Sequence, residues 1–229
     1  MAALLDRLHS TPRRTCAKKL PLFLLAYHRL RNQYSRTSLQ QPTLFSTAYD
    51  VLTYVPPIVL PPYPAARICR NIPHIASHIF HHAISPWSST HTFIYCDGSR
   101  TPGLGTGAAI YEDRSHLTQS IRLPDLATVA DAERAALLLA LRHGAARGLT
   151  HLCICTDSLS TLTALQCSPW HSPHDATLLA VKTLLFERAQ SFPSTYLIYT
   201  PGHSNLMGNT LAKQACHADA ITNLCGPWY

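Results

Sequence analysis

Residues 91–107 read HTFIYCDGSRTPGLGTG, and this stretch decides how the rest of the chain is interpreted. The apolar run Phe93–Cys96 is rich in β-branched and aromatic side chains, and Asp97-Gly98-Ser99 follows it directly. An apolar run that ends in turn residues predicts a buried strand. Asp97 would then stand where the strand leaves the core. Because Asp-Gly is also a common hairpin turn, the stretch gains weight only from its recurrence downstream.

The same arrangement returns at residues 152–158, which read LCICTDS and place Asp157 at the end of a second buried run. Between the two runs, Ala108–Tyr111 and Leu117–Leu123 have the character of strands in an antiparallel meander. Helices are expected over 132–147, 159–166 and 176–189, followed by a last strand over 196–199. The alternation of strand and helix with short connections predicts an α/β fold in which the later strands pair in parallel.

Three carboxylates stand at element ends: Asp97 and Asp157 after strands, and Glu133 in the first turn of a helix. If the two strands are parallel neighbours, the carboxylates converge and raise each other's pKa. A hard divalent cation relieves that repulsion, and oxygen ligands favour Mg²⁺ or Mn²⁺ over zinc. Such ions activate water in phosphodiester hydrolysis, and His203, after the last strand, is a candidate for proton transfer.

The order of these motifs resembles ribonuclease H, and more narrowly the ribonuclease H domain of non-LTR retrotransposon polyproteins. The resemblance covers about residues 91–218. It rests on five short motifs in this order: Tyr-Cys-Asp97-Gly98-Ser99, Ala132-Glu133, Cys-Thr-Asp157-Ser158, Tyr-Thr-Pro201-Gly202-His203 and Gly208-Asn209. It implies a five-stranded mixed sheet, with the first three strands antiparallel and helices on both faces. No reverse transcriptase sequence is present, so the resemblance identifies the chain as a C-terminal fragment of such a polyprotein.

The resemblance also implies a chemistry, in which two Mg²⁺ (or Mn²⁺) ions cleave the RNA strand of an RNA–DNA hybrid. Asp97 would bridge both ions, Glu133 and Asp157 would complete the ligands, and His203 would be a mobile auxiliary residue. Ser99 and Asn209 are the candidate nucleic-acid contacts, because hybrids are recognised by minor-groove shape and 2′-hydroxyl groups.

The sequence departs from the family after Asn209, where the family carries a further acid as fourth metal ligand. Aligned without a gap, Lys213 takes that position. Aligned with a gap of about four residues, 211–213 (LAK) fall on their family equivalents and the acid is missing; we prefer this version. Two hypotheses follow: an endonuclease of impaired activity, or a catalytically inactive retroelement remnant that keeps the fold and at most binds nucleic acid.

The chain divides into a basic extension, residues 1–90, and a ribonuclease H-like domain, residues 91–229. Residues 1–90 hold 10 Lys and Arg against 2 Asp and Glu, whereas residues 91–229 hold 9 against 10. A basic extension suits a polyanion such as nucleic acid, and equally a solvated tail. Five prolines within 50–66 predict an extended linker, and we expect part of the extension to be disordered. Helical spacing puts His74, His78 and His82 on one solvated face.

The eight cysteines include no C-x-x-C pair, which favours reduced thiols and an intracellular location, nuclear or cytoplasmic. A zinc module built on histidines and cysteines is an alternative that requires stoichiometric zinc. The first 49 residues have the composition of a mitochondrial transit peptide, a further alternative. The longest apolar run, Leu20–Ala26, is too short to span a bilayer, so no membrane partner is expected.

Overall fold

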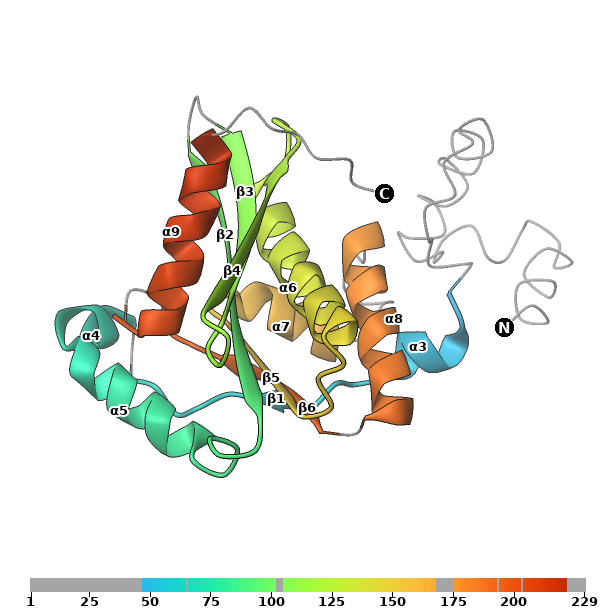
Figure 1. Ribbon diagram of the computed structural model, residues 1–229, viewed down its shortest axis with the longest axis horizontal. Helices are drawn as coiled ribbons and strands as arrows, with labels where there is room; N and C mark the ends of the chain where they lie inside the picture. Colours follow the sequence, from blue (N-terminus) through green and yellow to red (C-terminus); the bar gives the residue numbers. More distant parts are fainter. Residues whose placement is uncertain are drawn as a thin grey trace, which may run out of the picture.

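The computed structural model describes residues 47–64, 66–101, 105–167, 175–192, 194–202 and 204–221. The helix predicted around Leu20–Arg31 lies outside these residues. Within them the chain forms an α/β fold built on one mixed sheet, as the sequence predicts. Figure 1 shows the sheet between helices on both of its faces.

Three antiparallel strands form one half of the sheet: β2 (Thr92–Thr101), β3 (Gly105–Glu112) and β4 (Leu117–Leu123). The other half is parallel, with β5 (Leu152–Thr156) beside β2 and β6 (Thr195–Tyr199) beside β5. The predicted meander and the predicted parallel pairing are both confirmed. The first half of β2 and all of β5 are buried and largely apolar, because both faces of these central strands are covered.

The sheet has six strands where the resemblance implies five. The additional strand, β1 (Ile58–Val59), comes from the proline-rich segment and pairs in parallel with Leu197 and Ile198 of β6. The strand order is β1-β6-β5-β2-β3-β4. The prolines therefore flank an edge strand, which is where a sheet tolerates residues without an N–H donor. A short helix, α3 (Tyr49–Thr53), precedes it.

Alternate residues of each strand enter two separate cores. On one face Ile94, Cys96 and Ile154 pack with α6 (Val129–Ala146), α7 (Leu159–Gln166) and α8 (Ala176–Ser191). On the other face Tyr95 and Cys155 pack with α5 (Pro73–Ile84) and α9 (Met207–Ile221). In Figure 1, α9 and α5 accordingly lie on the opposite side of the sheet from α6 and α8.

The upstream residues 66–84 form two helices, α4 (Ala66–Asn71) and α5. Phe80 and Ile84 of α5 are buried against the sheet, whereas His74, His78 and His82 are exposed. The predicted solvated histidine face is therefore present. The described cysteines are all free thiols. Over the ranges given above, no helix combines the length and the apolar character needed to cross a membrane.

Candidate metal-binding and catalytic site

The pairing of β2 with β5 brings the two aspartates to the same level of the sheet. The predicted strand end at Asp97 is wrong, because β2 continues through Gly98 and Ser99 to Thr101, paired with β3. Cys96 is opposite Thr156, so Asp97 and Asp157 are the next residues on neighbouring parallel strands. Asp97 is only 6% exposed and Asp157 is half-buried. The convergence predicted from the sequence therefore arises from strand register.

Gly98 lets helix α6 approach β2 directly after Asp97. A Cβ atom at Gly98 would lie 2.2 Å from the Ala132 carbonyl carbon and 2.4 Å from the Glu133 nitrogen, so helix backbone occupies the space of a side chain. The Glu133 carboxylate is set further by Ser158, whose hydroxyl donates to Glu133 Oε2. Glu133 thus reaches the aspartates because residue 98 has no side chain.

The three carboxylates share one electrostatic environment. Burial raises the pKa of Asp97 to about 6, and the charges of Asp157 and, less strongly, Glu133 act in the same direction. Burial also raises the pKa of Glu133; the hydrogen bond from Ser158 opposes this increase and the charge of Asp157 adds to it. Mutual repulsion of this kind marks a group of acids brought together by the fold, and such groups concentrate at functional sites.

Helix α9 supplies the other side of Asp97 with a thiol and a cation. The Cys216 sulfur lies 3.2 Å from Asp97 Oδ2, 3.1 Å from Ser99 Oγ and 3.2 Å from the Lys213 carbonyl oxygen. Burial raises the pKa of Cys216 to about 12, so the thiol is protonated and donates. The positive charge of Lys213, one turn earlier, lowers the pKa of Asp97 and partly offsets the repulsion of the carboxylates.

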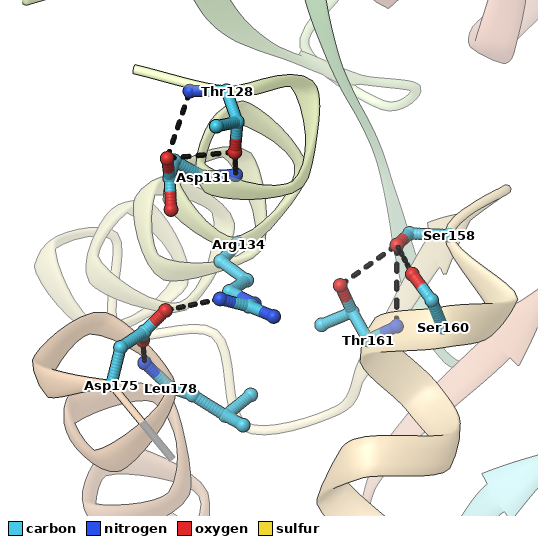
Figure 2. A network of polar contacts seen from close by, with 8 residues as sticks. All are labelled: Thr128, Asp131, Arg134, Ser158, Ser160, Thr161, Asp175 and Leu178. Atoms are coloured by element: carbon cyan, nitrogen blue, oxygen red, sulfur yellow. Dashed lines mark hydrogen bonds and ion pairs between the residues drawn. The ribbon is translucent and has the colours of Figure 1, made fainter. Parts of the chain in front are cut away.

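The helices α6, α7 and α8 each begin with a polar cap (Figure 2). The Thr128 hydroxyl and the Asp131 carboxylate form a capping box at the start of α6. Asp175 caps α8 by accepting from the Leu178 N–H, and it also binds the Arg134 guanidinium of α6. Ser158 caps α7 by accepting from the Thr161 N–H. These caps fix the helix that carries Glu133 relative to its neighbours.

The remaining predicted site residues lie around this centre. Ser99 is half-buried and faces α9, with its hydroxyl 3.4 Å from His217 Nδ1. Asn209 is 5% exposed in the first turn of α9, and its Oδ1 is buried without a hydrogen-bond partner. His203 lies outside the described residues. The adjacent Gly202 lies against Asp157, since a Cβ atom there would be 3.0 Å from Asp157 Oδ2.

The donor chemistry suits a hard cation, because Asp97, Glu133 and Asp157 offer only oxygen ligands. The arrangement is not a finished cage: among the residues that the structure describes, no three His, Cys, Asp or Glu side chains are close enough to hold a metal ion. Asp97 and Glu133 instead accept hydrogen bonds from Cys216 and Ser158. A cation would therefore have to displace these donors or draw the carboxylates together.

The sequence was compared with models of known protein families and with curated proteins. A family model described as RNase H matches residues 89–221, more than half of the chain. The chain belongs to the ribonuclease H family. A search of curated proteins found no match. For a ribonuclease H the mixed sheet, with one acid within β2 and one directly after β5, is the expected framework, and the family typically uses Mg²⁺.

Sequence reasoning did not find the roles of Cys216 and Ser158 in this ribonuclease H domain. Cys216 carried one usable signal, since it lies three residues after Lys213 and therefore on the same face of a helix. Ser158 was visible as part of the Asp157-Ser158 pair, but a hydroxyl after a strand also fits a plain helix cap. Its second role depends on how α6 and α7 pack, which no local pattern encodes.

Proposed function

We propose that this chain is a ribonuclease H-type endonuclease that hydrolyses the RNA strand of RNA–DNA hybrids, with impaired turnover. The observation that carries the proposal is the convergence of Asp97, Glu133 and Asp157: the charge of Asp157 raises the pKa of both Asp97 and Glu133, and the charge of Glu133 raises that of Asp97. Family membership supports the hybrid substrate and the requirement for Mg²⁺. The motifs around these acids support an origin in a non-LTR retrotransposon.

The chain's own residues have defined tasks in this reaction. Asp97, Glu133 and Asp157 would hold Mg²⁺ or Mn²⁺, which when bound supplies an activated water and stabilises the leaving oxygen. Ser158 orients Glu133 by its hydrogen bond. Gly202 leaves room beside Asp157 because it has no side chain, and we assign proton transfer to the adjacent His203.

The impairment is attributed to Lys213. Its positive charge acts on Asp97, and an ammonium group repels a divalent cation in the space between α9 and Asp97. This supports the alignment without a gap, in which Lys213 stands where the family has its fourth acid. A cation held by fewer acids binds more weakly. An activation barrier that is higher by about 1.4 kcal/mol already slows the reaction about tenfold.

Nucleic acid is the proposed partner for a second reason. The excess positive charge lies in residues 1–90, which include α4 and α5 beside the domain. Contacts from this part would be insensitive to base sequence and would weaken with salt. Ser99 and Asn209 remain candidates for direct contact; both require α9 to shift, because Ser99 faces Cys216 and Asn209 is buried.

The test is cleavage of a labelled RNA–DNA hybrid by the full chain in Mg²⁺ or Mn²⁺. Asp97→Asn should abolish cleavage, and Lys213→Asp should raise it at least tenfold. Gln214→Asp places the same carboxylate at an exposed neighbouring position of the helix, with a charge change of one unit instead of two, and should leave the rate unchanged. Manganese binding followed by electron paramagnetic resonance should show tighter binding for Lys213→Asp alone.

A second function is favoured by the absence, within the described ranges, of three metal-ligating side chains close enough for a metal ion. It is a non-catalytic remnant that keeps the fold and binds nucleic acid. Equal lack of cleavage by wild type, Asp97→Asn and Lys213→Asp, together with salt-dependent hybrid binding by all three, would establish the remnant and exclude the enzyme.

A further inference from the structure

A segment upstream of the family match is built into the sheet edge next to the proposed site. Residues 47–64, here called the strap, comprise α3, β1 and the proline-rich residues around them. Its strand pairs with β6, and the Leu197 N–H donates to the Pro57 carbonyl at 3.0 Å. At its other end, the buried Lys182 ammonium of α8 donates to the Leu52 carbonyl at 2.7 Å.

Near the C-terminal end of the strap, Tyr63 contacts Tyr199, the last residue of β6. The Tyr63 hydroxyl donates to the Tyr199 carbonyl at 3.3 Å, across 136 positions of sequence. The two rings meet edge to face, with centroids 5.8 Å apart and an interplanar angle of 72°. Burial raises the pKa of Tyr63, so the hydroxyl keeps its proton and remains a donor.

The chain reaches the proposed site directly after this contact. Tyr199 is paired with Thr156, the residue before Asp157, and the Thr200 N–H donates to the Thr156 carbonyl at 2.9 Å. Three residues after Tyr199, Gly202 lies against the Asp157 carboxylate, with 3.0 Å between Oδ2 and the position of a Cβ atom. A displacement at Tyr199 is therefore transmitted to the loop beside Asp157.

We propose that Tyr63 is a positioning residue for the ribonuclease H site, and that it holds the end of β6 so that Gly202 stays against Asp157. Tyr63 acts through its contact with Tyr199 and not through a contact with any of the three carboxylates. The inference rests on the proposed function only where it predicts a change in manganese affinity. The positioning of the loop itself follows from the contacts of Tyr63 and Tyr199.

The Tyr63 hydroxyl, rather than its ring, is the group that defines the position. The ring is partly buried in the second core with Val59 and Tyr196, and phenylalanine would preserve this packing. The hydroxyl fixes the height of the Tyr199 carbonyl along the strand, because a hydrogen bond constrains distance and direction together. Removing it leaves the packing intact and frees the strand end.

The test compares Tyr63→Phe with Tyr54→Phe in the full chain. Tyr54 belongs to the same strap, but its ring packs on Phe186 of α8, with centroids 5.7 Å apart, in the core on the other face of the sheet from Tyr63. Hydrogen exchange should show the Thr200 and Gly202 amides exchanging about fivefold faster in Tyr63→Phe, the factor expected for one neutral hydrogen bond, and unchanged in Tyr54→Phe. Manganese affinity should fall several-fold in Tyr63→Phe alone.

The outcomes separate this inference from the proposed function. Unchanged exchange at both amides in Tyr63→Phe overturns the positioning role, whatever the enzyme does. Faster exchange with no manganese bound by the wild-type chain supports the positioning role and counts against the nuclease. Equal acceleration in both variants overturns the inference as well, because it indicates a general loosening of the strap.

Discussion

Adding a single methyl group at Gly98 should separate α6 from β2. The alanine Cβ atom would lie 2.2 Å from the Ala132 carbonyl carbon and 2.4 Å from the Glu133 nitrogen. Ordinary contact begins near 3.4 Å, so the two backbones must move apart by about 1.2 Å. Neither can give way by a rotamer change, because the obstructing atoms are main-chain atoms of a capped helix.

The expected cost of Gly98→Ala is at the upper end of the range for overpacked cores, about 3 kcal/mol or more. The shift also carries Glu133 away from Asp97, because the clash is at the Glu133 nitrogen itself. Urea unfolding without metal measures the first effect. The second appears as a pKa of Asp97 closer to its ordinary value, measured by NMR titration of the carboxyl carbon.

The control is Gly144→Ala, on the same face of α6. There a Cβ atom would meet only Leu152 Cδ2, at 2.8 Å, which is the end of a flexible side chain. Alanine is favoured over glycine in a helix by about 1 kcal/mol, so this variant should be nearly neutral. Our account of how α6 is placed is refuted if Gly98→Ala is as stable as Gly144→Ala.

Three further predictions concern charge and pH, each measured by urea unfolding without divalent metal. Because folding raises the pKa of Asp97 from 3.8 to about 6, stability present below pH 4 is lost as the pH rises; Asp97→Asn should therefore gain up to about 3 kcal/mol on wild type by pH 7. Burial, His151 and Arg114 lower the pKa of His91, whose Nε2 lies 2.7 Å from Ser194 Oγ; stability should therefore fall as the pH drops below 6.5, and less so in His91→Gln. Burial raises the pKa of Glu112, but hydrogen bonds and nearby charges, chiefly from His143, outweigh it and lower the pKa; Glu112→Gln should cost about 1–3 kcal/mol at pH 7, and the cost should vanish as the pH falls below 4.5. A flat difference across pH would contradict the respective prediction.

The central fold was predictable because its signals are local. The run before Asp97 and the run before Asp157 are both short and apolar, and the structure makes them the first half of β2 and the whole of β5. The turn expected at Asp97-Gly98-Ser99 was wrong, because these residues continue β2 and pair with β3. The capping box of Thr128 and Asp131 marks the start of α6 in the sequence. The two aspartates could be placed side by side because parallel neighbours end at the same edge of a sheet.

The strap could not be predicted, because what defines it is distant in sequence. Its prolines predict extended backbone, and residues 54–64 indeed contain no helix and include the strand β1. Whether an extended segment is a linker or an edge strand depends on a partner, here Leu197 and Ile198, nearly 140 residues later. Lys182 would be expected on the surface, because lysines in helices are normally exposed. In the structure it is buried and donates to the Leu52 carbonyl of the strap.

Helix α9 shows why the fourth side of the site needed coordinates. A gap of four residues is close to one helical turn, so apolar periodicity alone fits both alignments. The structure adds the contacts on that side: Cys216 reaches Asp97 Oδ2, and the charge of Lys213, three residues earlier, lowers the pKa of that carboxyl. Asn209 instead lies one residue after Gly208, which packs on the Tyr95 ring, two residues before Asp97 on the strand. The α9 groups that act on Asp97 are therefore a thiol and an ammonium, and the weaker cation binding that we propose depends on the ammonium.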